Sequence, residues 1–206
     1  MRPDRIPLFP LNVVLIPGAD LPLHIFEPRY RGMVKNCLED ETEFGVLLAL
    51  PNGMARVGCT AEITRVIQRY EDGRLDILTH GRAPFRVTEL LANNPLLEGM
   101  VEYLEDEDSP AEAAVRKQLF ELYEACYTLV FGDYPKDMEE QAASGISYHM
   151  AASLPLDLLW KQQILELRDE AARQERLVAL FRDWAPRLQQ ATQRKRAAGG
   201  NGHGWN

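Results

Sequence analysis

The most informative part of the chain is IPLFPLNVVLIPGADLPLHIFEPRYRGMVKNCL, residues 6–38. Its prolines and glycine divide the first part into short apolar runs, of which VVLIP at 13–17 is expected to be a β-strand. The period then changes, because apolar residues from Tyr30 to Leu38 recur at helical spacing and Pro28 suits a first helical turn. The stretch therefore predicts extended segments followed by a helix over 27–40.

More β-rich runs follow this helix. They lie at 44–50, 61–70, 75–79 and 84–91. Asp72-Gly73 stands between the second and third of them and predicts a hairpin turn, since glycine tolerates positive φ. Apolar residues do not alternate cleanly in 61–70, which leaves a β-bulge or burial on both faces open. With so many turn residues between short strands, the first half of the chain is expected to form a β-barrel or sandwich.

Composition changes near residue 108, after the acidic run 105–108. From there the apolar residues follow a helical period. Helices are expected at about 110–130, 137–152 and 156–168, with a fourth carrying Leu177 to Leu188. Ser109-Pro110 and Glu112 resemble a capping box at the start of the first. Four helices would make a bundle that packs on the barrel.

Charge and hydropathy exclude several classes of protein. The 206 residues contain 23 Lys and Arg against 31 Asp and Glu, a net charge of −8, and 46% are hydrophobic. That is enough apolar material for a folded core. We do not expect binding to nucleic acid or to an anionic membrane, because both need a cationic face. There is no uncharged apolar run of transmembrane length and no signal-like start, so we expect a cytoplasmic protein.

The chain carries little that resembles a catalytic or metal site. No glycine is followed by lysine, so the Walker A pattern for nucleotide phosphates is missing. His24 and Glu27 form an HxxE triplet that we interpret as a strand histidine and an edge carboxylate, and we expect neither a metal nor a cofactor. Ser147 and His149 are the only candidates for a hydrolase dyad, without the GxSxG motif. The three cysteines, Cys37, Cys59 and Cys126, are expected to be buried free thiols.

The opening stretch closely resembles the N-terminal, substrate-binding domain of the Lon ATP-dependent proteases. This module also occurs alone in bacterial proteins and within cereblon. PLFPL, a Pro-Gly turn and LPLHIFEPRY carry the resemblance, with further matches at FGVLL, VGCTAEI, EDGRLDILTHG, PFRV and SLPLDLLWKQQILEL. It covers about residues 5–190. The chain departs from the family at Gly58-Cys59-Thr60 and at Ala83-Pro84-Phe85-Arg86, where turns are expected to differ locally.

The resemblance implies an α+β fold, a PUA-like β pseudo-barrel followed by a C-terminal helical bundle. We place the barrel at 1–108, the bundle at 109–194 and a flexible tail at 195–206. In Lon proteases this module helps to recognise unfolded or tagged proteins, while separate ATPase and Ser/Lys peptidase domains hydrolyse them. The implied function is non-catalytic: binding of unfolded or partly folded polypeptides in protein quality control, with a protease or a chaperone as a further partner.

The candidate partner-binding residues are Phe26, Glu27, Arg29 and Tyr30, with the helix after them and the groove where barrel meets bundle. The alternative is that these residues only lock a crossing of the barrel, with Glu27 and Arg29 paired to each other.

Other functions remain open beside polypeptide binding. PUA-like folds also bind RNA, and five arginines within 22 residues could form a basic face, although nearby carboxylates are expected to pair with them. These are Arg65, Arg69, Arg74, Arg82 and Arg86. A small hydrolase using Ser147 and His149 is the third possibility. The apolar surface around Phe181, Trp184 and Leu188 leaves a homodimer open.

Overall fold

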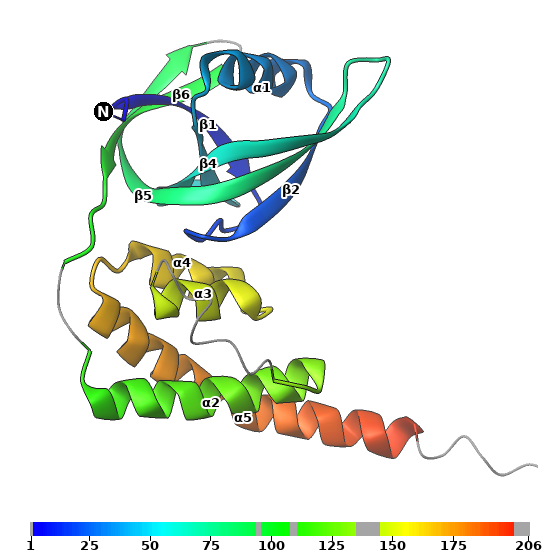
Figure 1. The fold of residues 1–206 in the computed structure, drawn as a ribbon, viewed down its shortest axis with the longest axis vertical. Coiled ribbons are helices and arrows are strands. Elements are labelled where there is room, and N and C mark those ends of the chain that lie inside the picture. Colours follow the sequence, from blue (N-terminus) through cyan, green and yellow to red (C-terminus); the bar gives the residue numbers. More distant parts are fainter. Residues whose placement is uncertain (1, 94–95, 108–110, 135–144, 200–206) are drawn as a thin grey trace, which may run out of the picture.

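The structure is a computed structural model that describes residues 2–93, 96–107, 111–134 and 145–199. A β-barrel forms one half of the molecule and a bundle of helices forms the other (Figure 1). The predicted α+β fold, a β pseudo-barrel followed by a helical bundle, is confirmed. The proposed boundary at 108/109 lies outside the described residues.

Six strands and one helix make up the barrel. They are β1 (Arg5–Leu11), β2 (Asp20–Ile25), α1 (Pro28–Asp40), β3 (Phe44–Leu50), β4 (Gly53–Arg69), β5 (Leu75–Asn93) and β6 (Leu96–Tyr103). The strand order is β2-β5-β4-β3-β1-β6, and a further pairing of β5 with β6 closes the sheet. Strand β1 runs parallel to β3, while the other pairs are antiparallel. Because β5 bends, it pairs first with β2 and β4 and then with β6.

The hairpin between β4 and β5 confirms the turn predicted at Asp72-Gly73. The Tyr70 backbone N–H donates to the Arg74 carbonyl at 3.0 Å, and Gly73 has a φ of +83°. Register shifts between Ile63 and Arg65, and again further along β4, show that the uneven alternation in 61–70 reflects bulges.

The predicted strand at 13–17 is wrong. These residues form an irregular segment between β1 and β2, although Val14, Leu15 and Ile16 are buried. Gly81 holds the segment, because its N–H donates to Ala19 O and its carbonyl accepts from Gly18 N–H, both at 2.9 Å. The apolar run therefore indicates burial in the core, and a loop can bury apolar side chains as well as a strand can.

Helix α1 matches the predicted helix and covers one end of the barrel (Figure 1). It buries Tyr30, Met33, Val34 and Cys37 against the barrel core. The helix ends at Glu41, whose φ of +51° places it in the left-handed region. The spacing of apolar residues thus identified both the helix and its buried face.

The bundle contains four helices within the described residues. They are α2 (Ala113–Phe131), α3 (Ile146–Ser153), α4 (Leu158–Glu166) and α5 (Glu170–Gly199). Helix α2 packs along α5 (Figure 1). The proposed cap at Ser109-Pro110 and the first half of the helix expected at 137–152 lie outside the described residues, while its second half corresponds to α3. Helix α5 includes 195–199, the start of the expected tail, and 200–206 lie outside the described residues.

Arg173 of α5 joins the bundle to the chain that leaves the barrel. Its side chain is 0% exposed and donates to both carboxylate oxygens of Asp106 and to Glu170. The guanidinium also lies 4.1 Å from the centre of the Tyr148 ring. Since Asp106 follows β6 and Tyr148 belongs to α3, one buried cation ties three segments together.

None of the helices in the described ranges combines the length and the apolar character that crossing a bilayer requires.

Candidate functional site

Phe26, Glu27 and Arg29 form the accessible part of the predicted site between β2 and α1. The Phe26 side chain is 60% exposed. Arg29 Nε donates to Glu27 Oε2 at 2.9 Å, so these two residues pair as the alternative interpretation expected. The Glu27 carbonyl accepts from the Tyr30 and Arg31 backbone N–H groups, which begins α1. These bonds hold the backbone at the start of α1, and the segment presents one large apolar side chain, Phe26, to solvent.

Tyr30 has a different environment from the other three candidates. It is 6% exposed and its ring stacks on Phe9 of β1, with centroids 3.9 Å apart. Burial raises the pKa of its phenol. The Arg29 guanidinium lies 4.6 Å from the ring centre. Tyr30 therefore packs α1 on the barrel, and a partner at this surface would meet Phe26 and Arg29 first.

Phe26 belongs to an aromatic patch, which we define as His24, Phe26 and Tyr70. The His24 ring lies 6.0 Å from Phe26 and 5.9 Å from Tyr70, measured between centroids. Asp76 connects two members of the patch. His24 Nδ1 lies 2.5 Å from one carboxylate oxygen, and the Tyr70 hydroxyl donates to the other at 2.7 Å. These two hydrogen bonds lower the pKa of Asp76. The HxxE pair is thus split, since His24 pairs with Asp76 and Glu27 with Arg29.

A basic groove adjoins the aromatic patch and shares Tyr70 with it. Its volume is about 460 Å³, and its charged lining residues are Arg31, Lys35, Arg69 and Arg74. Arg31 donates to the Asp72 carbonyl at 2.6 Å, while Arg74 pairs with the Asp72 carboxylate at 2.7 Å. The arrangement can accommodate an apolar side chain beside a negative charge.

The predicted arginine face is mostly paired. Arg74 bonds Asp72, Arg82 bonds Glu62, and Arg86 lies 3.9 Å from Glu102. Two of these acids, Glu62 and Asp72, are among the neighbours expected from the sequence. Only Arg69 and Arg74 of the five arginines line the basic groove.

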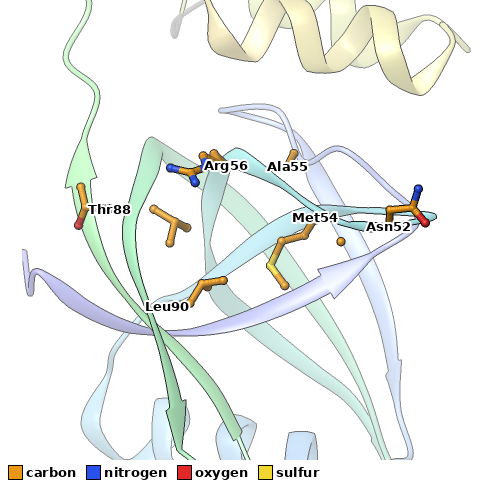
Figure 2. Close-up of a pocket in the computed structure, with 8 residues that line it drawn as sticks. Asn52, Met54, Ala55, Arg56, Thr88 and Leu90 are labelled. Carbon is orange, nitrogen blue, oxygen red and sulfur yellow. The ribbon is translucent and has the colours of Figure 1, made fainter.

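A second recess opens between β4 and β5, on the side of the barrel that contacts the bundle. We call it the strand cleft; its volume is about 350 Å³. The lining residues are Asn52, Gly53, Met54, Ala55, Arg56, Val87, Thr88 and Leu90. In Figure 2 the Met54 side chain reaches from β4 toward Leu90 on β5. Leu90 is 51% exposed, so this recess also presents an apolar side chain to solvent.

A third recess lies on the bundle between α4 and α5. It has a volume of about 690 Å³ and is lined by Leu159, Trp160, Trp184 and Leu188 together with polar residues at its edge. The two tryptophan rings meet edge to face at 6.4 Å, and Leu159 is 59% exposed.

None of the three recesses described above is lined by residues of both halves, so the predicted groove where barrel meets bundle stays a prediction. The residues around α1 and the strand cleft lie apart. Helix α1 and the segment before it sit at the end of the barrel remote from the bundle (Figure 1). The strand cleft lies near the bundle instead, where Gln162 of α4 donates to the Val57 carbonyl at 3.0 Å. A single short ligand therefore cannot touch both.

The hydrolase candidates do not form an accessible dyad. Ser147 is fully buried, and its hydroxyl donates to Glu170 at 2.6 Å and accepts from Arg173 Nε at 2.8 Å. Burial lowers the pKa of His149. Ser147 therefore belongs to the buried hydrogen-bond network of Arg173 and Glu170 and is not accessible to a substrate.

The three cysteines are buried, and the described residues contain no cluster suited to a metal ion. Cys37, Cys59 and Cys126 are free and buried, as predicted. Burial raises the pKa of each thiol, to about 11 for Cys126, so the nucleophilic thiolate is disfavoured. Across the described ranges, no three His, Cys, Asp or Glu side chains gather closely enough to hold a metal ion.

The sequence contained one overlooked signal for the strand cleft. Leu90 and Leu91 are adjacent in a strand, and neighbouring side chains point to opposite faces. One of the two leucines must therefore lie on the outer face of the barrel. No such signal marks Met54 or Arg56, because they come close to Leu90 only through the fold.

The chain is similar to a known protein family and to solved structures. Residues 5–183 match the family described as the ATP-dependent protease La (LON) substrate-binding domain. The crystal structure of a Lon N-terminal domain protein from Xanthomonas campestris is similar, with a TM-score of 0.69 and 29% identity over 85% of this chain and 97% of that one. The N-terminal domain of a Mycobacterium avium complex Lon protease shares the fold, with a TM-score of 0.59 and 17% identity over 88% and 98% of the two chains.

Full-length relatives are much longer. A Lon protease from Anaeromyxobacter dehalogenans is 25% identical over 195 residues, which are 87% of this chain and 23% of that protein. The chain spans 14–24% of the length of this protein and four other curated Lon proteases that it matches.

Proposed function

Because the chain belongs to the ATP-dependent protease La (LON) substrate-binding domain family, we propose that it recognises unfolded or partly folded polypeptides and does not itself hydrolyse them. Its place would be in protein quality control in the cytoplasm. A protease or a chaperone would receive the bound polypeptide.

The exposed apolar side chains carry this proposal. Phe26 lies in the aromatic patch, Leu90 in the strand cleft and Leu159 in the recess between α4 and α5. Large apolar residues that border recesses are typical of polypeptide-binding surfaces. Unfolded chains expose such residues and bury them when folded, so this surface would select for the unfolded state.

The test is a titration of a fluorescently labelled, reduced and alkylated protein that cannot refold, followed by anisotropy. We expect micromolar binding that Phe26→Ala weakens about tenfold, which corresponds to a loss of about 1.4 kcal/mol. Tyr30→Phe is the matched control, because it keeps the ring that packs on Phe9. Leu159→Ala measures how much the recess between α4 and α5 contributes to the binding of the unfolded protein.

A labelled RNA oligonucleotide, titrated at low and moderate salt, tests the alternative. RNA binding that disappears as salt rises would favour the basic groove and the RNA-binding function. If every surface substitution in both halves leaves polypeptide binding unchanged, the proposed function fails.

Two companion measurements address catalysis and assembly. We expect no labelling of Ser147 by a fluorophosphonate probe, since its hydroxyl is buried and bonded to Glu170. Sedimentation equilibrium would show whether the apolar surface near Trp184 forms a homodimer.

A further inference from the structure

We infer that the strand cleft binds an extended polypeptide segment by strand addition, with hydrogen bonds from the open edges of β4 and β5. The inference rests on the proposed function, since its occupant is a polypeptide. It goes further by naming the site and the conformation of the bound chain.

The pairing of β4 with β5 stops before either strand ends. It runs from the hairpin to Val57 and Arg86. Beyond that point Gly53 and Met54 pair with β3, while Val87–Asn93 pairs with β6. Among the described pairings, the edges of β4 and β5 that would continue to face each other carry no strand. Each such edge offers backbone N–H and C=O groups to an added chain.

The strands diverge because bulges bend both of them. The register of β3 on β4 shifts between Leu47 and Ala49, and that of β5 on β6 shifts between Val87 and Glu89. Bulges bend a strand and increase its twist. The gap between β4 and β5 therefore results from the bulges in the β3–β4 and β5–β6 pairs.

The lining of the cleft suits the side chains of an extended chain. Ala55 and Val87 are buried at its base, while Met54 and Leu90 border it and Leu90 is exposed. Backbone hydrogen bonds from an open edge, combined with apolar pockets for alternate side chains, are what strand addition requires. Neither Gly53–Arg56 nor Val87–Leu91 contains proline, which would remove an edge donor.

The bundle contacts β4 next to the cleft. Gln162 Nε2 of α4 donates to the Val57 carbonyl at 3.0 Å, at the point where β4 and β5 separate. A side-chain amide thus satisfies a backbone carbonyl of β4 there. An added segment would lie between Gly53–Arg56 and Val87–Leu91, beyond this amide.

The probe is a fluorescein-labelled peptide of alternating valine and threonine with a lysine at each end. Two further peptides carry N-methyl groups on the valines or on the threonines, so that each lacks the N–H donors of one edge. We expect the parent peptide to bind and at least one N-methylated peptide to bind tenfold or more weakly. Equal binding of all three would overturn strand addition, because contacts made by side chains alone do not require those donors.

Variants of the protein locate the site. Leu90→Asp should weaken binding of the parent peptide at least tenfold, while Ile67→Asp should leave it unchanged. Ile67 is the matched control, because it is an aliphatic residue of β4 outside the cleft and is 49% exposed against 51% for Leu90. Circular dichroism checks that each variant is folded, and Met54→Glu replaces Leu90→Asp if that variant is not. Unchanged binding by a folded cleft variant would overturn the location.

The labelled unfolded protein separates the two proposals. If it binds wild type while neither N-methylation nor cleft substitution matters, the proposed function stands and strand addition is wrong. If neither the unfolded protein nor the peptide binds, both fail.

Discussion

The barrel and the bundle are held together in different ways. In the barrel, backbone pairing joins strands as distant in sequence as β1 and β6, and β5 alone pairs with three neighbours. In the bundle, helices satisfy their own backbone groups, so side chains decide how they pack. Chief among these is Arg173, whose fully buried guanidinium pairs with Asp106 and Glu170.

This difference means that the two halves are sensitive to different changes. Pairing of strands requires close approach of backbones, and a small added group can prevent it. A buried cation requires its carboxylates, and loss of one partner leaves the others without compensation. Substitutions at a close backbone contact in the barrel and at the buried cation of the bundle test whether the two halves differ in this way.

Arg173→Met should have the largest effect. It removes the buried partner of Asp106 and Glu170, whose side chains are themselves 45% and 24% exposed, so we expect the free energy of unfolding in urea to fall by about 3 kcal/mol. Arg176→Met is the control, because the half-buried Arg176 bonds only the Gln163 side chain among the described residues, and it should change stability by less than about 0.5 kcal/mol. A similar small loss for both variants would show that the charge network does not hold the bundle.

Gly58→Ala tests the barrel. A Cβ at Gly58 would lie 2.3 Å from the Val46 carbonyl oxygen and 2.9 Å from Phe85, so β3 and β4 would have to move apart. Such overpacking costs about 1–3 kcal/mol. Gly32→Ala is the matched change in α1, where no neighbour lies within 4 Å, and it should raise the midpoint of unfolding by the gain in helix propensity. Equal effects of the two substitutions would contradict the close approach.

Alkaline pH should destabilise the protein through its buried acids. Burial raises the pKa of Cys126 from 9.0 to about 11, and it also raises the pKa of Tyr123 beside it in the bundle. The folded protein thus keeps these protons while the unfolded chain releases them, and stability falls as pH rises from about 9 toward 11. The loss is about 1.4 kcal/mol per pH unit for each group that ionises only on unfolding.

The check is urea unfolding at several pH values for wild type and Cys126→Ala. The variant should lose stability less steeply between pH 9 and pH 11, whatever its stability at pH 7. Identical slopes would mean that Cys126 ionises equally in both states.

The smallest effect concerns the helix caps of the bundle. Asp157 Oδ1 accepts from the Leu159 N–H at 2.8 Å at the start of α4, so Asp157→Ala should cost about 1 kcal/mol. Glu112 makes no side-chain cap bond at the start of α2, and Glu112→Ser should therefore stabilise the protein slightly. Thermal unfolding midpoints of the two variants should move in opposite directions.

Much of the fold could be predicted from local patterns. Helical spacing identified α1 and the four helices of the bundle, and Asp72-Gly73 identified the β4–β5 turn. The strand predicted at 13–17 failed because an apolar run reports burial and not hydrogen bonding. Strands β1 and β6 were not singled out, since their pairing involves residues more than 80 positions apart.

The candidate site was predictable only in part. Phe26 is exposed as a partner-binding residue should be, whereas Tyr30 from the same motif packs under α1. Helical spacing placed Tyr30 on the apolar face of α1, but Phe26 lies before the helix and its exposure depends on what the barrel covers. The binding roles of both remain predictions.

Local patterns were enough to assign the family and the β-then-α order of the chain, because periodicity and motif spacing involve residues close in sequence. The residue type alone was enough to expect that the three cysteines are buried. The folded chain was needed to show where β4 and β5 separate, which carboxylates surround Arg173 and which apolar side chains stay exposed. These features depend on contacts between residues far apart in the chain, and their geometry comes from strand twist, bulges and helix packing that no local pattern records.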